Sequence, residues 1–147
     1  MTPFAPNPGP MHHIGVVVDD LETAVAQYLA LGFVEAGRER IDEQNVDIVA
    51  LQAGVSWVEL LAPLDHDSAL GRFLAKRGPG IHHVAYLVDD LPATLTALAE
   101  RGVEMIDLSP RVGMHGWHIA FVHPRASAGV LTELVDRAST EAAASHH

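Results

Sequence analysis

The sequence of 147 residues contains no cysteine, which excludes disulfide bonds, thiolate metal ligands and a cysteine nucleophile. Basic residues are scarce too: nine Lys and Arg stand against 19 Asp and Glu, giving a formal net charge of −10. Nucleic-acid binding depends on clustered cations, so this balance argues against a nucleic-acid partner. No apolar run approaches the roughly 18 residues that a membrane span needs. A small molecule is therefore the expected partner.

Both ends of the chain look separate from the folded part. Residues 1–10 contain four prolines and lack a basic region followed by an apolar stretch, which predicts a flexible, extended arm and a cytoplasmic protein. Residues 139–147 resemble a linker with a clipped affinity tag, and we expect a disordered tail there. The hydrophobic content of 48% predicts a well-buried interior for the remainder, a single domain over residues 11–138.

A long internal repeat divides this domain. Residues 11–21 (MHHIGVVVDDL) and 81–91 (IHHVAYLVDDL) agree at six of eleven positions, and Gly32 and Gly102 each follow the second aspartate of their copy by twelve residues. Such agreement indicates a duplicated module. Module one is predicted at residues 11–62, a linker at 62–80 and module two at 81–137.

Each module is predicted to form a βαβββ unit, so the fold class is α+β. A β-branched run leads to an aspartate cap, apolar residues at helical spacing and a glycine stop, and three further strands follow. Strands are expected at 12–18, 33–41, 46–52 and 55–61 in the first module, and at 82–88 and near 103–107, 117–122 and 130–136 in the second. Helices are expected at 21–31 and 90–100, and a short amphipathic helix at 67–77 in the linker.

Alternation of side chains across the strands selects four polar residues. His13 and His83 should lie on the face opposite the covering helix, while His12 and His82 point to the helix side and are interpreted as structural. Glu59 and Glu133 close the two modules among apolar neighbours, where an unpaired carboxylate would be costly. Singly, such residues are usually structural histidines and edge-strand charges. Their recurrence at matched positions instead predicts a divalent-metal site.

A basic turn forms the one cationic cluster outside this pattern. Arg72, Lys76 and Arg77 precede Gly78-Pro79-Gly80. They are either a contact for a phosphate-bearing substrate or a solvated helix face, and the sequence leaves both interpretations open.

Over residues 11–137 the chain resembles the vicinal oxygen chelate (glyoxalase/bleomycin-resistance/dioxygenase) superfamily, and within it the methylmalonyl-CoA epimerases. Residues 73–85 and 119–134, which end in HHVA and LTEL, carry the closer likeness. The resemblance implies an eight-stranded open cup-shaped sheet and a homodimer. It also implies one divalent ion, Co, Ni, Mn, Zn or Fe, held by His13, Glu59, His83 and Glu133. Imidazole and carboxylate ligands do not select among these metals.

The activity implied by the resemblance is removal of the α-proton from a chelated acyl-CoA, namely epimerisation of methylmalonyl-CoA, with Glu133 as ligand and base. Epimerisation needs a second base on the opposite face of the planar intermediate. Ile48 stands where the resemblance places a glutamate. Either a bulge turns Asp47 inward, or Glu43 reaches the site from the strand end, or the protein does not epimerise.

Two other functions remain open at this level. One is a lactoylglutathione lyase of the glyoxalase I type, because bacterial enzymes of that kind are similar in using a His-Glu-His-Glu ligand set. The other is a non-enzymatic protein that binds a small molecule or drug. Members of the superfamily that only bind a ligand generally lack the full ligand set, which disfavours the second alternative.

Overall fold

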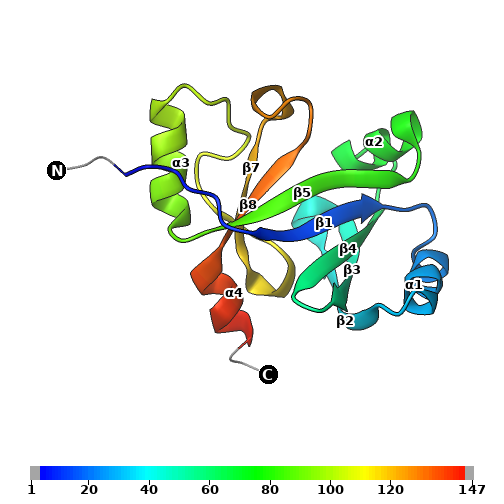
Figure 1. Cartoon of the computed structure of the whole chain (residues 1–147). Helices are drawn as coiled ribbons and strands as arrows, with labels where there is room; N and C mark the ends of the chain where they lie inside the picture. Colours follow the sequence, from blue (N-terminus) through cyan, green and yellow to red (C-terminus); the bar gives the residue numbers. More distant parts are fainter. Residues whose placement is uncertain (1–3, 145–147) are drawn as a thin grey trace. The chain divides into compact units, whose positions relative to one another are not determined.

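Residues 4–144 are described by the computed structural model of the chain (Figure 1). Contacts divide the chain into two compact units. The first half is His13–His82, and the second half comprises the segment up to His12 together with the residues from His83 onward. The helix of the predicted linker belongs to the first half.

The first half contains the predicted βαβββ order followed by a helix. Its strand order is β2-β3-β4-β1, with β1 parallel to β4 and the other neighbours antiparallel. Its elements are β1 (Met11–Val17), α1 (Leu21–Ala30), β2 (Val34–Ile41), the 3-10 helix η1 (Asp42–Gln44), β3 (Val46–Ala53), β4 (Ser56–Pro63) and α2 (Ala69–Arg77).

The second half repeats this order. Its strands follow one another as β5-β8-β7-β6, with β5 parallel to β8. Its elements are β5 (Gly80–Val88), α3 (Leu91–Glu100), β6 (Arg111–Val112), the 3-10 helices η2 (Met114–Gly116) and η3 (Pro124–Ala126), β7 (His118–Val122), β8 (Thr132–Asp136) and α4 (Arg137–Ala144).

Aspartate caps start the two matching helices, as the repeat predicts. The Asp20 carboxylate accepts the backbone N–H of Thr23 and the Asp90 carboxylate accepts that of Ala93, both at 3.0 Å. Such a bond satisfies one of the N–H groups that a helix start leaves without a partner. Each helix ends before a glycine of positive φ, Gly32 or Gly102.

Each helix covers one face of the strands in its own half (Figure 1). In the first half Val25 of α1 packs with Val49, Leu51 and Leu60, and Ile14, Val16 and Val18 of the first strand segment join this cluster. In the second half the corresponding cluster combines α3 with strands β7 and β8; its members include Leu91, Leu95, Ala120, Val122 and Leu134. The more apolar face of the strands therefore packs against the helix, which confirms the predicted orientation of the strand faces.

Two segments differ from the sequence-based expectation. The strand predicted near 103–107 is reduced to a single bridge between Met105 and Val122, and the strand that pairs with β7 forms later, at Arg111–Val112. The disordered tail predicted from residue 139 is corrected as well. Helix α4 continues to Ala144 and is tied to β7, since the His118 N–H donates to Ser139 Oγ at 3.0 Å. Residues 145–147, which contain the tag-like histidines, lie outside the described residues.

The N-terminal arm makes backbone contacts with β5. The Gly9 N–H donates to the Leu87 carbonyl at 2.7 Å, and the Leu87 N–H donates to the Pro10 carbonyl at 3.0 Å. Among the helices that the structure describes, none combines the length and apolar content needed to cross a bilayer.

Candidate functional site

The first half holds a buried imidazole–carboxylate pair. His13 lies on β1 and Glu59 on the neighbouring parallel strand β4, where Glu59 stands opposite Gly15. His13 Nε2 lies 3.4 Å from Glu59 Oε2. The exposed fraction is 1% for His13 and 5% for Glu59, so both groups are withdrawn from bulk water.

The second half holds a matching pair. His83 lies on β5 and Glu133 on the parallel strand β8, where Glu133 stands opposite Ala85. His83 Nε2 lies 3.4 Å from Glu133 Oε1, and both residues are 3% exposed. The repeat in the sequence is thus a repeat in side-chain geometry.

Strand register explains why the two pairs form. In each half a small residue, Gly15 or Ala85, stands opposite the glutamate on the neighbouring parallel strand. The histidine lies two residues before this small residue. Positions two apart on a strand share a face, so histidine and glutamate project to the same side. A small residue opposite the carboxylate leaves room for the imidazole to reach it.

The two pairs differ in their third neighbour. In the first half Ala50 of β3 stands opposite Glu59, whereas in the second half Phe121 of β7 stands opposite Glu133. The Phe121 ring meets His83 edge-on, with ring centroids 5.7 Å apart. The Arg111 guanidinium lies over the same ring, 5.5 Å from its centroid, and forms an ion pair with Asp107. The sequence did not single out Phe121 or Arg111.

The donor chemistry of both pairs fits a divalent cation. Imidazole nitrogen and carboxylate oxygen are ordinary ligands of Zn, Fe, Co, Ni and Mn. Buried charges in proteins are normally paired or bound to metal. Among the described residues, His13, His83 and Glu133 are buried side chains, and each offers a nitrogen or oxygen atom that could be the ligand of a metal ion.

The candidates for a second base lie elsewhere in the first half. Strand β3 pairs regularly from Val46 to Ala53, so Ile48 shares its face with Ala50 and Glu59, and Asp47 projects to the helix side. Glu43 lies in η1 and is exposed. The structure therefore does not bring Asp47 to the face of Glu59, and the bulge that would turn it inward is absent from β3 as described.

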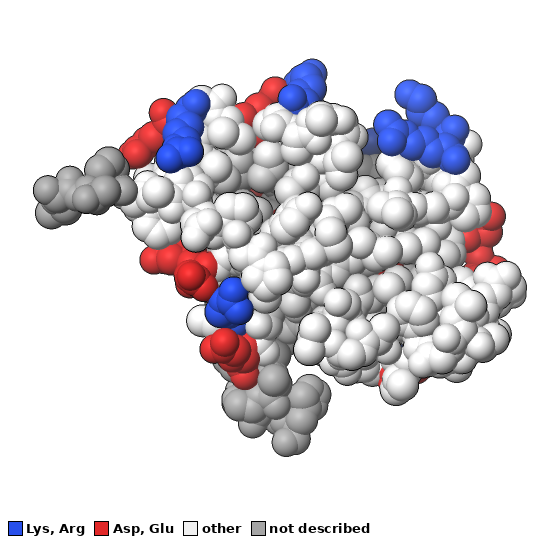
Figure 2. Space-filling model, in the orientation of Figure 1, with Lys and Arg blue, Asp and Glu red and all other residues white. Residues whose placement is uncertain are grey.

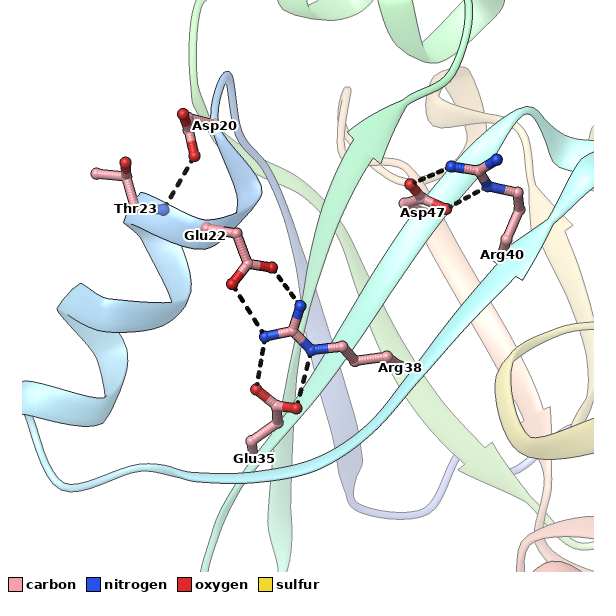
Figure 3. Close-up of polar contacts among 7 residues, drawn as sticks. All are labelled: Asp20, Glu22, Thr23, Glu35, Arg38, Arg40 and Asp47. Carbon is pink, nitrogen blue, oxygen red and sulfur yellow. Dashed lines mark hydrogen bonds and ion pairs between the residues drawn. The ribbon is translucent and has the colours of Figure 1, made fainter.

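Asp47 is instead engaged in an ion pair (Figure 3). Its carboxylate accepts two hydrogen bonds from Arg40 of β2, at 2.8 and 2.9 Å. Hydrogen bonding to the Arg40 guanidinium lowers the pKa of the Asp47 carboxyl below its ordinary value. A lowered pKa makes a carboxylate a weaker base, which further disfavours Asp47 in proton abstraction.

His12 and His82 make ring contacts with aromatic side chains. His12 meets Trp117 edge-on at 4.6 Å between centroids, and His82 meets Phe73 edge-on at 4.8 Å. These contacts accord with the structural role that the sequence suggested for both residues.

Comparison with protein families gives one match that spans most of the chain. The model of the Glyoxalase/Bleomycin resistance protein/Dioxygenase superfamily matches residues 12–121. That range contains three members of the two buried pairs, His13, Glu59 and His83.

Relatives of similar length are found in bacteria. The uncharacterized protein YqjC of Bacillus subtilis is 40% identical over 86% of this chain and 91% of its own length. An ethylmalonyl-CoA/methylmalonyl-CoA epimerase of Cereibacter sphaeroides is 34% identical over 86% of this chain and 96% of its own length.

A solved structure shares the fold. A variant of Streptomyces coelicolor methylmalonyl-CoA epimerase, in complex with 2-nitronate-propionyl-CoA, superposes with a TM-score of 0.85 and 37% identity. The match covers 88% of this chain and 95% of that one. Together with the element order, this confirms the predicted α+β glyoxalase fold of two βαβββ modules.

Proposed function

Because this chain belongs to the Glyoxalase/Bleomycin resistance protein/Dioxygenase superfamily, we propose that it is a metal-dependent epimerase acting on an acyl-CoA, most specifically methylmalonyl-CoA. The observation that carries the proposal is the buried His–Glu pair present in each half, at 3.4 Å in both. Relatives with epimerase activity in their names span nearly the whole chain, which supports this chemistry over others in the superfamily.

We propose that His13, Glu59, His83 and Glu133 together hold one divalent ion, which is Co, Ni, Mn, Zn or Fe. When bound, such an ion supplies positive charge beside the substrate oxygens and eases removal of the neighbouring proton. The burial of the four side chains supports this role, since electrostatic interactions strengthen where water is excluded.

Epimerisation requires two proton-transfer groups. Glu133 is proposed as the first: its carboxylate takes the α-proton, and the electron pair of the broken C–H bond moves toward the thioester carbonyl. A second group then protonates the opposite face of the planar carbon, which inverts the configuration. Glu43 and Asp47 are the sequence-based candidates for this second group, but Asp47 projects to the helix side of β3 and is bound by Arg40.

Incubation of the metal-loaded protein with one epimer of methylmalonyl-CoA in deuterated water tests the proposal. We expect the two epimers to equilibrate and deuterium to enter the α-position, as followed by chiral analysis and mass spectrometry. Protein stripped with a chelator should lose the activity and regain it when a divalent metal is returned.

The same preparation tests the alternatives. Turnover of the hemithioacetal of methylglyoxal and glutathione, with no α-exchange in methylmalonyl-CoA, would contradict the epimerase and favour the lyase. Binding of acyl-CoA without exchange or turnover would favour a non-enzymatic binder.

Homodimer formation and a location in the cytoplasm complete the proposal. Sedimentation analysis at micromolar concentration tests the first, and fractionation of the source cells tests the second.

A further inference from the structure

An acidic residue that shares the face of the first-half pair lies on β2. The register of β2 and β3 sets Glu39 opposite Ile48, and the register of β3 and β4 sets Ile48 opposite Leu61 and Ala50 opposite Glu59. Residues opposite one another in antiparallel strands project to the same face, with Cβ atoms about 5 Å apart. Glu39 therefore lies on the face that carries Glu59.

The neighbours of Glu39 on β2 point the other way (Figure 3). Arg38 donates two hydrogen bonds of 2.9 Å to Glu35 and also binds Glu22 of α1, while Arg40 binds Asp47. Both arginines are exposed and their charges are met by carboxylates on the helix side of the strands. Glu39 between them is partly buried, as alternation predicts for a residue turned to the opposite face.

Carboxylates are rare on this face. Among the described strand residues of the first half, the acidic ones are Glu35, Glu39, Asp47 and Glu59. Glu35 stands opposite Leu51, a member of the cluster under α1, and Asp47 lies on that same side. Glu39 and Glu59 are thus the two strand carboxylates on the site face, with the side chains of Ile48 and Ala50 between their strands.

We propose that Glu39 is the second proton-transfer residue of the epimerisation, an assignment that rests on the proposed function. In one direction the Glu39 carboxylic acid gives its proton to the planar α-carbon and the C–H bond forms from the electron pair held at the carbonyl. In the other direction the carboxylate takes the α-proton. No electrons are gained or lost, and solvent restores the starting protonation states.

Glu39→Gln separates this role from a structural one. The amide keeps the shape of the side chain and removes its capacity to accept a proton, so interconversion of the epimers should fall by about 10²–10⁴-fold. One epimer should still exchange its α-proton for deuterium with retained configuration, because the other base continues to act. Metal content and thermal stability should match those of the original protein. Glu35→Gln, the same change on the same strand but on the helix side, should epimerise at the original rate.

A rescue variant sharpens the test. Positions 39 and 48 are cross-strand neighbours on one face. Adding Ile48→Glu to Glu39→Gln should therefore raise the rate of epimerisation at least about tenfold above that of Glu39→Gln alone. Recovery of that kind is not expected if Glu39 only stabilises β2.

Three results would overturn the assignment. The first is epimerisation by Glu39→Gln at the original rate. The second is an equal loss of exchange in both epimers with no rescue by Ile48→Glu, which identifies a structural role. The third is failure of the unsubstituted protein to epimerise or exchange any acyl-CoA. This result refutes the proposed function itself, and it is obtained without any variant.

Discussion

Glu133 is the residue on which the proposed chemistry depends most, because it is assigned both metal binding and proton transfer. Its carboxylate is 3.4 Å from His83 and almost fully buried. Glu133→Gln should lower the rate of epimerisation by about 10²–10⁴-fold, since an amide cannot take the proton. Bound metal should fall as well, because the amide lacks the negative charge. Steady-state kinetics and elemental analysis by mass spectrometry measure the two effects.

The same half offers a matched control. Glu104 is exposed and accepts hydrogen bonds of 2.6 and 3.1 Å from Arg125, outside the buried pair. Glu104→Gln should leave metal content and rate unchanged. A Glu133→Gln protein that keeps its metal and its rate would show that the carboxylate is neither ligand nor base.

At the residue scale, the face on which a polar strand side chain lies was predictable from sequence only where the repeat gave a second copy. Matched positions in two modules predicted the faces of four residues, and the structure pairs His13 with Glu59 and His83 with Glu133. Glu39 had no such support, and a β-bulge at Ala36 concealed its orientation. Glu35 stands opposite Leu51 and Gly37 opposite Ala50, so one extra residue lies between them. A bulge reverses the face of every later residue relative to simple alternation, and sequence periodicity does not reveal it.

At the level of the elements, helix α2 carries a cationic surface. Five of the nine Lys and Arg residues form ion pairs with carboxylates in the described structure; they are Arg38, Arg40, Arg111, Arg125 and Arg137. Three of the other four, Arg72, Lys76 and Arg77, lie on α2 and are exposed, and Figure 2 shows basic side chains gathered over this helix. The phosphates of an acyl-CoA could bind few other cations in the described structure, because most of the remaining Arg side chains are paired with carboxylates.

Charge reversal on α2 distinguishes a contact for substrate phosphates from a solvated helix face. If it meets substrate phosphates, the double substitution Lys76→Glu and Arg77→Glu should raise KM for methylmalonyl-CoA about tenfold, corresponding to about 1.4 kcal/mol. The value of kcat should change little, and KM should respond less steeply to salt. Arg101→Glu, at the end of α3, supplies an exposed cation in the second half as a control. Equal KM values in all three proteins would identify α2 as a solvated helix face.

Most elements could be predicted because their signals are local. The caps at Asp20 and Asp90, the glycine stops and the alternating strands all depend on residues next to one another in sequence. The exceptions depend on distant partners. Strand β6 consists of Arg111 and Val112 and exists only through its pairing with β7, and α4 is held by a bond from β7 to Ser139. Tertiary contacts of this kind override weak local preferences.

The molecule as a whole contains one buried His–Glu pair in each of its two units. A repeated pair is compatible with one ion per chain held by four ligands or with two ions held by two ligands each. Three or four protein ligands are normal for a tightly held zinc ion, whereas two would leave about half of its coordination positions to water. The proposed function therefore requires one ion per chain.

Metal stoichiometry and thermal unfolding together test this requirement. Titration should end at one divalent ion per chain, and His13→Ala and His83→Ala should each abolish nearly all binding, although the two histidines belong to different halves. With free metal at 100 times its dissociation constant, folding should gain about 2.7 kcal/mol, which a chelator should remove. For a chain of this length the gain corresponds to a rise in Tm of roughly 5–10 °C. Two ions per chain, with each histidine substitution removing only one of them, would show that the halves bind metal independently, and the four-ligand site would be refuted.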